Sequence, residues 1–169
     1  MEIQIRKGTV DDLEQFLELL RVVHGEMVHK EWFYLDEPGE VRQMLQEGIL
    51  EFWVAMDGAR MAGAFSIVIP GLRTFNYGYD LFFDEAKLLQ VVNMDTIAVH
   101  REYRGRGLQK CLMQEAEREV AKRRPRILLC TVHPDNVFSL NNILDQGYTI
   151  AGRLPKYGSE RCLLRKNLL

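Results

Sequence analysis

The sequence contains little cysteine and almost no net charge, and each shortage excludes a class of protein. Its three cysteines, Cys111, Cys130 and Cys162, form no CxxC pair, so they suggest neither a zinc site nor a disulfide framework, and we expect buried thiols. The 22 basic and 24 acidic residues leave a formal net charge of −2. A nucleic-acid-binding surface needs a clear basic excess, so we expect no nucleic acid partner.

Long apolar runs are also lacking, since none approaches the length that crosses a bilayer. The first residues, MEIQIRKGTVDDLEQF, have no apolar segment behind a basic one, as a secretion signal would. We therefore expect a cytoplasmic protein without a membrane partner. With 47% apolar and 27% charged residues, the 169-residue chain fits one globular domain over residues 1–169.

Hydrophobic periodicity predicts a mixed α/β chain. Apolar residues recur at helical spacing over 9–29, where Thr9 can cap the helix with Asp12. A second helix is expected after residues 36–40. A third is expected to begin at Leu108 and to end before Pro125, and a fourth is expected over 136–146. The predicted strands span residues 2–6, 51–56, 60–69, 91–99, 126–132, 148–154 and 161–168. Residues 71–90 are aromatic and acidic without a period, which predicts a long loop with at most one helical turn.

The stretch VHREYRGRGLQKCLM, residues 99–113, joins a predicted strand to a predicted helix through two glycines. The first amides of a helix have no intrahelical partner, and Gly105 and Gly107 let an anion approach the backbone. Arg101, Arg104 and Arg106 add cationic donors, so the turn predicts a phosphate or pyrophosphate site. Neither the P-loop nor the Rossmann glycine pattern fits. The alternative is a tight turn with a solvated arginine cluster.

The longer stretch TIAVHREYRGRGLQKCLM resembles the acyl-CoA pyrophosphate loop of the GNAT-type N-acetyltransferases, whose pattern is Arg/Gln-x-x-Gly-x-Gly/Ala. Arg104, Gly107 and Gln109 occupy its fixed positions, although Gln109 departs from the usual Gly or Ala. A second segment, HPDNVFSLNNILDQGY, is similar to the family's next helix, with Asn136 where an Asn contacts the CoA arm and Ser139 beside the phosphopantetheine.

This resemblance implies the GNAT fold, an α/β arrangement with a mixed, mostly antiparallel sheet of about seven strands and about four helices. The sheet would open after its fourth strand to admit the CoA arm. The implied donor is acetyl-CoA, with no metal, and the implied reaction is direct acetyl transfer to a primary amine of a small molecule, amino acid or peptide. The implied cofactor-binding residues are Ile97, Ala98, Val99, Arg104, Gly105, Arg106, Gly107, Leu108, Gln109, Asn136 and Ser139.

Acyl transfer needs a base, because an amine with a pKa of ~10.4 is almost entirely protonated at neutral pH. Asp95 is the first candidate, with Asp84 and Glu85 as alternatives, although Asp95 could instead only hydrogen-bond a neighbouring strand. The resemblance assigns the oxyanion to the backbone N–H of Ile97. The family's usual proton-donating Tyr falls at Ile143, so solvent, or a residue such as Ser139, Asn142 or Tyr157, would protonate the thiolate.

Aromatic residues mark candidate acceptor walls. Trp32 and Tyr34 lie between the first two predicted helices, and Tyr79 and Glu85 lie on the long loop, where an acidic lid would suit a cationic amine. Two rival readings stay open: a CoA-binding module without catalysis, which Ile143 favours, and a generic nucleotide-binding domain. The oligomeric state is open as well, although the aromatic loop and the C-terminal strand could support a homodimer.

Overall fold

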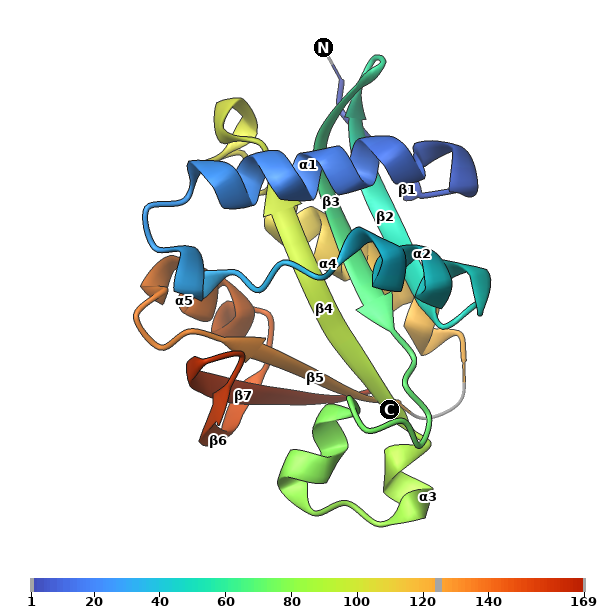
Figure 1. Cartoon of the computed structure of the whole chain (residues 1–169), viewed down its shortest axis with the longest axis vertical. Coiled ribbons are helices and arrows are strands. Elements are labelled where there is room, and N and C mark those ends of the chain that lie inside the picture. Colours follow the sequence, from blue (N-terminus) through green and yellow to red (C-terminus); the bar gives the residue numbers. More distant parts are fainter. Residues whose placement is uncertain (1, 124–125, 169) are drawn as a thin grey trace.

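A seven-stranded sheet forms the centre of the protein (Figure 1). The computed structural model describes residues 2–123 and 126–168. The strand order is β1-β2-β3-β4-β5-β7-β6, and only β4 and β5 run parallel among the neighbouring pairs. The strands are β1 Gln4–Lys7, β2 Leu50–Asp57, β3 Arg60–Val68, β4 Val91–Val99, β5 Arg126–Val132, β6 Thr149–Lys156 and β7 Ser159–Leu168. The mixed, mostly antiparallel sheet expected from the sequence is therefore confirmed.

Five α-helices accompany the sheet in the described part of the chain. They are α1 Leu13–Glu26, α2 Pro38–Gln46, α3 Glu85–Leu88, α4 Leu108–Ala121 and α5 Val137–Asp145. The helix predicted over 9–29 is shorter than expected, because its first turn is a 3₁₀ helix and the backbone becomes extended at Met27. Pro125, which was expected to stop α4, lies outside the described residues. Within those residues no helix combines the length and the apolar character needed to span a membrane.

Helices cover both faces of the sheet. Helices α1 and α2 pack on one face, where the rings of Phe16 and Phe52 stack with centroids 4.6 Å apart. Helices α4 and α5 pack on the other face, where Leu112 and Ile143 join the same buried cluster (Figure 1). Apolar burial contributes ~25 cal/mol per Å², so the packing of these two helical layers on the sheet stabilises the fold.

The segment over residues 71–90, expected as a long loop, is built around two buried asparagines. It contains a 3₁₀ helix, Tyr77–Leu81, in addition to α3. Asn76 Nδ2 donates to the carbonyls of Gly71 and Leu88 (2.7 and 3.0 Å), and Asn93 Nδ2 on β4 donates to the carbonyl of Phe75 (3.0 Å). These side-chain bonds satisfy backbone groups that no strand partner reaches, so the segment is fixed to the sheet.

The sheet opens between its two parallel strands. The pairs between β4 and β5 run from Val91↔Ile127 to Asn93↔Leu129 and extend no further in the described strands, although both strands continue. Strand β5 stays paired with β7 as far as Val132, and β4 stays paired with β3 as far as Val99. Beyond Asn93, β4 therefore presents backbone N–H and C=O groups to an opening rather than to a strand.

The entry to α1 depends on one carboxylate. The backbone N–H of Thr9 donates to Asp12 Oδ2 (2.8 Å), which completes the predicted capping box. The partner on β1 was not predicted: Arg6 donates to both oxygens of Asp12 at 2.7 and 2.8 Å. The Arg6 guanidinium lowers the pKa of Asp12 to about 2, so the carboxylate is held in its ionised form.

We expect Asp12→Asn to lower the free energy of unfolding at pH 7 by about 1–2 kcal/mol, because Arg6 then loses its ionised partner. Since the pKa of Asp12 is lowered on folding, this contribution is complete above about pH 4 and is lost as the pH falls through about 2. Urea denaturation at pH 7 and pH 2 measures both values, with Asp11→Asn as the control. An equal loss at both pH values would contradict this account.

Candidate functional site

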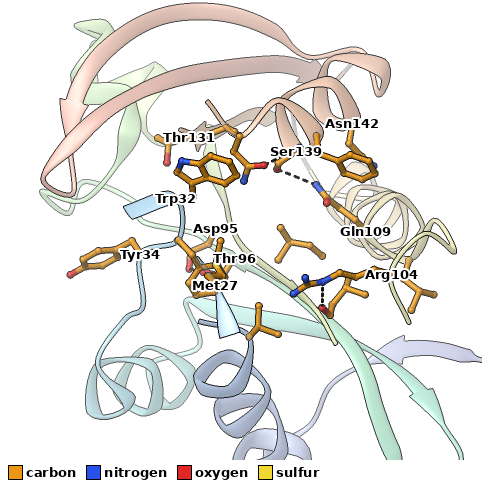
Figure 2. A pocket seen from close by; sticks show the side chains of 18 of the residues that line it. Met27, Trp32, Tyr34, Asp95, Thr96, Arg104, Gln109, Thr131, Ser139 and Asn142 are labelled. Atoms are coloured by element: carbon orange, nitrogen blue, oxygen red, sulfur yellow. Dashed lines mark hydrogen bonds between the residues drawn. The ribbon is translucent and has the colours of Figure 1, made fainter. Parts of the chain in front are cut away.

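A cleft of about 650 Å³ lies where β4 and β5 separate (Figure 2). Its lining comes from six parts of the chain: the end of α1 with residues 27–36, the second half of β4, the glycine turn with the first turn of α4, the end of β5, the start of α5, and the β6–β7 hairpin with the start of β7. Residues far apart in the sequence therefore meet around one opening, which makes this cleft the candidate site.

A β-bulge directs Asp95 toward this cleft. Met94 pairs with Ile67 and Thr96 pairs with Ser66, so Asp95 is an extra residue on β4 without its own partner on β3. Bulges often redirect a side chain beside a functional site. The sequence left open which face of the sheet Asp95 occupies, because simple alternation has no place for a bulge. In the structure Asp95 lines the cleft.

Two hydroxyl groups donate hydrogen bonds to Asp95, and the charge of a second carboxyl acts on it. Thr96 Oγ1 and Ser66 Oγ donate to its Oδ2 at 3.3 and 3.5 Å. Burial, together with the negative charge of Asp36, raises the pKa of Asp95 to about 7. Asp36 lines the same cleft, and burial together with the charge of Glu40 raises its pKa to about 6. The two carboxyls titrate as a pair in the range where enzymes exchange protons.

The glycine turn has the geometry expected of an anion site. Gly105 and Gly107 have φ of +77° and +74°, a region that favours glycine, and no atom lies within 4 Å of where their side chains would begin. Gly107 is also the N-cap of α4. The free amides of the helix entrance therefore open toward the cleft, where the helix dipole favours negative charge.

The arginines of this turn have different positions. Arg104 lines the cleft, and its Nε donates to the carbonyl of Val99 (3.2 Å), which ties the turn to the end of β4 (Figure 2). The guanidinium of Arg106 instead lies 5.2 Å from the ring centroid of Tyr103 and is outside the lining. Only one of these two side chains is therefore placed to meet a ligand.

The start of α5 forms the opposite bank of the cleft. Asn136 is its N-cap, with Oδ1 accepting from the N–H of Ser139 (3.3 Å). Gln109, where a smaller residue was expected, extends its amide to Ser139 Oγ (3.4 Å) and so links α4 to α5 (Figure 2). Ile143 is 4% exposed, lies in the core and does not line the cleft.

The other end of the cleft is aromatic. Trp32 and Tyr34 follow α1, and Figure 2 shows Asp95 and Thr96 between Tyr34 and Arg104. The ring of Tyr34 stacks on Tyr157 of the β6–β7 turn, with centroids 4.2 Å apart. Tyr157 has φ of +56°, an uncommon conformation for a bulky residue. Its strained placement supports a specific role for this ring at the cleft.

The segment over residues 71–90 contacts the β6–β7 hairpin. The hydroxyls of Tyr77 and Tyr157 lie 2.7 Å apart, and Lys156 pairs with Asp80 at 2.9 Å. Burial raises the pKa of Tyr157 to about 12, although its bond to Tyr77 acts in the opposite direction. Tyr79 and Glu85 lie outside the lining: the hydroxyl of Tyr79 donates to the carbonyl of Leu72, and Glu85 begins α3. The segment packs against the hairpin and does not place Tyr79 or Glu85 over the cleft, so the acidic lid expected from the sequence is not found there.

Arg161 on β7 is the buried cation of the site, and it was not predicted from the sequence. The residue is 4% exposed and lines the cleft. Its Nη1 donates to the carbonyl of Trp32 (3.2 Å), and its Nη2 donates to that of Glu31 (2.5 Å). Burial lowers its pKa, which an arginine tolerates without losing its proton. Its place in an apolar strand was the available signal.

Most residues predicted for the site meet in this cleft. They are Trp32, Tyr34, Asp95, Ile97, Val99, Arg104, Gly105, Gly107, Leu108, Gln109, Asn136 and Ser139. Ala98 is 2% exposed and packs in the cluster under α1, so only its backbone could serve the cleft. Asp36 and Arg161 line the cleft and were not predicted.

Known proteins share this fold. A model of the Acetyltransferase (GNAT) family matches residues 13–148. The protein yncA from Salmonella typhimurium, solved with its cofactor acetyl-CoA, superposes with a TM-score of 0.74 at 16% identity over 99% of this chain and 95% of its own. The ribosomal-protein-alanine N-acetyltransferase of Brucella melitensis gives 0.73 at 20% identity over 96% and 98%.

A phosphinothricin acetyltransferase from Sinorhizobium meliloti, in complex with acetyl-CoA, superposes with a TM-score of 0.72 at 17% identity. The superposition covers 99% of this chain and 89% of that one. No curated protein matches the sequence significantly. At these identities the structural matches establish the fold, and the family model connects it to the sequence.

We expect Asp95→Asn to stabilise the protein at pH 8 by up to about 4 kcal/mol. Because the pKa of Asp95 is raised on folding to about 7, ionisation opposes folding as the pH rises from about 4 to 7. The gain should vanish at pH 4, where the carboxyl is protonated in both states. Urea denaturation at pH 4, 6 and 8 measures it, and a gain independent of pH would refute the buried ionisation.

Proposed function

Because the chain belongs to the GNAT family of acetyltransferases, we propose that it transfers the acetyl group of acetyl-CoA directly to a primary amine of a small molecule, amino acid or peptide. One observation carries this proposal: a carboxyl with a pKa near neutrality, Asp95, shares a cleft with the glycine turn that can hold a diphosphate. The turn suits the carrier, and the carboxyl suits the chemistry that the carrier's thioester requires.

In this proposal the diphosphate of acetyl-CoA rests on the amides of residues 105–109 and beside the guanidinium of Arg104. A helix entrance with positive-φ glycines favours such a group through its free N–H donors and its dipole. The pantetheine arm then follows the open edge of β4, where Val99 and Ile97 line the cleft, with Asn136 and Ser139 on the opposite bank. The acetyl-CoA in two of the similar structures supports this choice of donor.

Asp95 is the proposed base. An ammonium group of pKa ~10.4 must lose a proton before its nitrogen can attack, and a carboxylate can accept that proton directly or through water. An ordinary aspartate is a weak base, whereas burial and the charge of Asp36 raise the pKa of Asp95 to about 7. The shift strengthens the base and leaves a large part of it ionised at neutral pH.

The nitrogen then attacks the thioester carbon, and the backbone N–H of Ile97 is the proposed donor to the oxygen that becomes negative. When the intermediate collapses, the C–S bond breaks, the nitrogen loses its second proton to water, and CoA leaves as a thiolate. Tyr157, with a pKa of about 12, is a poor acid, and Ile143 cannot donate a proton. Because a thiol has a pKa of ~8.5, water can protonate the leaving group, and no dedicated acid is needed.

Cofactor binding is tested with Arg104→Glu, which places a negative charge beside the diphosphate. Isothermal titration with CoA should show an affinity about 10–100-fold lower than that of the wild type. The control is Arg118→Glu on α4, since Arg118 is exposed and pairs only with Glu115 in the described chain. Equal affinities for the wild type and Arg104→Glu would refute the placement of the diphosphate.

Catalysis is tested by the pH profile of thiol release from acetyl-CoA with a panel of primary amines. We expect kcat/KM to rise through an apparent pKa near 7, and Asp95→Asn to lower kcat by about 10²–10⁴-fold while CoA affinity is retained. Turnover that persists undiminished in Asp95→Asn would remove Asp95 from the mechanism. CoA binding without turnover of any amine would favour the non-catalytic CoA-binding module instead.

Asp36→Asn tests the coupling between the two carboxyls. Removing the charge of Asp36 should lower the pKa of Asp95, so the rising limb of the kcat/KM profile should move to lower pH, by about half a unit or more. The rate at pH 6 relative to pH 8 is the direct measure. A limb that stays in place would show that Asp36 does not act on the base.

A further inference from the structure

Arg161 has a charge that the protein itself does not neutralise. Its guanidinium forms no ion pair in residues 2–123 and 126–168, and its two hydrogen bonds go to the uncharged carbonyls of Glu31 and Trp32. Its buried Nε has no hydrogen-bond partner in the same described residues. A charge placed in such surroundings is unfavourable unless it is paired, so this position favours a negative partner from outside the chain.

The surroundings of Arg161 place that partner in the acceptor end of the cleft. The guanidinium lies 5.8 Å from the ring centroid of Tyr157, and it donates to the backbone carbonyls of Glu31 and Trp32. This is the aromatic end, away from the glycine turn where the proposed function puts the diphosphate. The anion that would meet Arg161 therefore belongs to the acceptor and not to the cofactor.

Negative charge is also present in this cleft, on the carboxyls of Asp95 and Asp36. The negative charges of Asp95 and Asp36 raise the pKa of Tyr157, whose ring also faces Arg161. Asp36, Asp95, Tyr157 and Arg161 all line this one cleft. A ligand that suits both kinds of charge carries an ammonium group for the carboxyls and an anionic group for the guanidinium.

Resting on the proposed function, we propose that the acceptor is a free amino acid whose carboxylate pairs with Arg161 while its amine faces Asp95. Arginine is suited to this role because its planar guanidinium matches a carboxylate with directed N–H donors. A peptide N-terminus is disfavoured, since its first residue presents a neutral amide where the free amino acid presents a charge. The bonds of Arg161 to residues 31 and 32 then keep its guanidinium in place for the ligand.

The test compares the standard amino acids and ornithine with their α-carboxamides as acetyl acceptors, so that only the carboxylate differs within each pair. For at least one pair the wild type should give a kcat/KM about tenfold or more higher for the acid. Arg161→Gln should lower kcat/KM for that acid about 10–100-fold, mainly through KM, and change the carboxamide by less than about threefold. Arg161→Lys should keep part of the preference.

Arg153→Gln is the matched control, because Arg153 lies on the neighbouring strand β6 opposite Cys162, is exposed and pairs with Glu160. It should leave the preference unchanged. Carboxamides accepted as well as acids by the wild type would overturn the proposal and favour peptide acceptors. An equal loss for acid and carboxamide in Arg161→Gln would also overturn it, since that is the result of a purely structural role.

A binding measurement separates this inference from the proposed function. The N-acetyl amino acids and their amides are titrated into CoA-saturated protein, and the acid should bind about tenfold or more tightly in the wild type and not in Arg161→Gln. If no amine is acetylated but this preference is present, the transferase proposal fails and the anion site stands. If amines are acetylated without any such preference, the site fails and the transferase stands.

Discussion

The separation of β4 and β5 beyond the Asn93↔Leu129 pair is the constraint on which the rest of the structure depends. Backbone donors and acceptors that would pair with each other in a continuous parallel ladder face an opening there, so they need other hydrogen-bond partners. Helices α4 and α5 pack on the same face of the sheet and meet this opening with their N-termini. A ligand with a diphosphate at one end and an amide-rich arm behind it satisfies both requirements.

Electrostatics divides the cleft into three regions with different tasks. The helix entrance beside Arg104 attracts negative charge, the bulge at Asp95 holds a carboxyl that exchanges its proton near neutrality, and Arg161 offers a second positive charge at the aromatic end. Screening by water is weakest at Arg161, which is 4% exposed, and strongest at the exposed Arg104. Burial that is unfavourable for folding at Asp95 also raises its pKa, which is the property that the proposed base requires.

Sequence patterns predicted the local features of the site. The glycine turn and the N-cap Asn136 depend on φ preferences and unpaired amides, which a short stretch of residues fixes by itself. The orientation of Asp95 could not be predicted, since the bulge exists only through the register with β3. Asp36 matters because of Asp95 on a distant strand, and Arg161 because of carbonyls 129 and 130 residues away in the chain. Tyr79 and Glu85 lie outside the cleft because two buried asparagines order their segment.

The turn between β6 and β7 has a consequence for how this protein can change. Tyr157 adopts the left-handed backbone conformation that glycine or asparagine would occupy more favourably, at a penalty on the order of 1 kcal/mol. Replacing it would relax the hairpin and remove the ring that stacks on Tyr34. If the ring contributes to the proposed acceptor site, selection for thermal robustness and selection for that ligand act in opposite directions on this single residue.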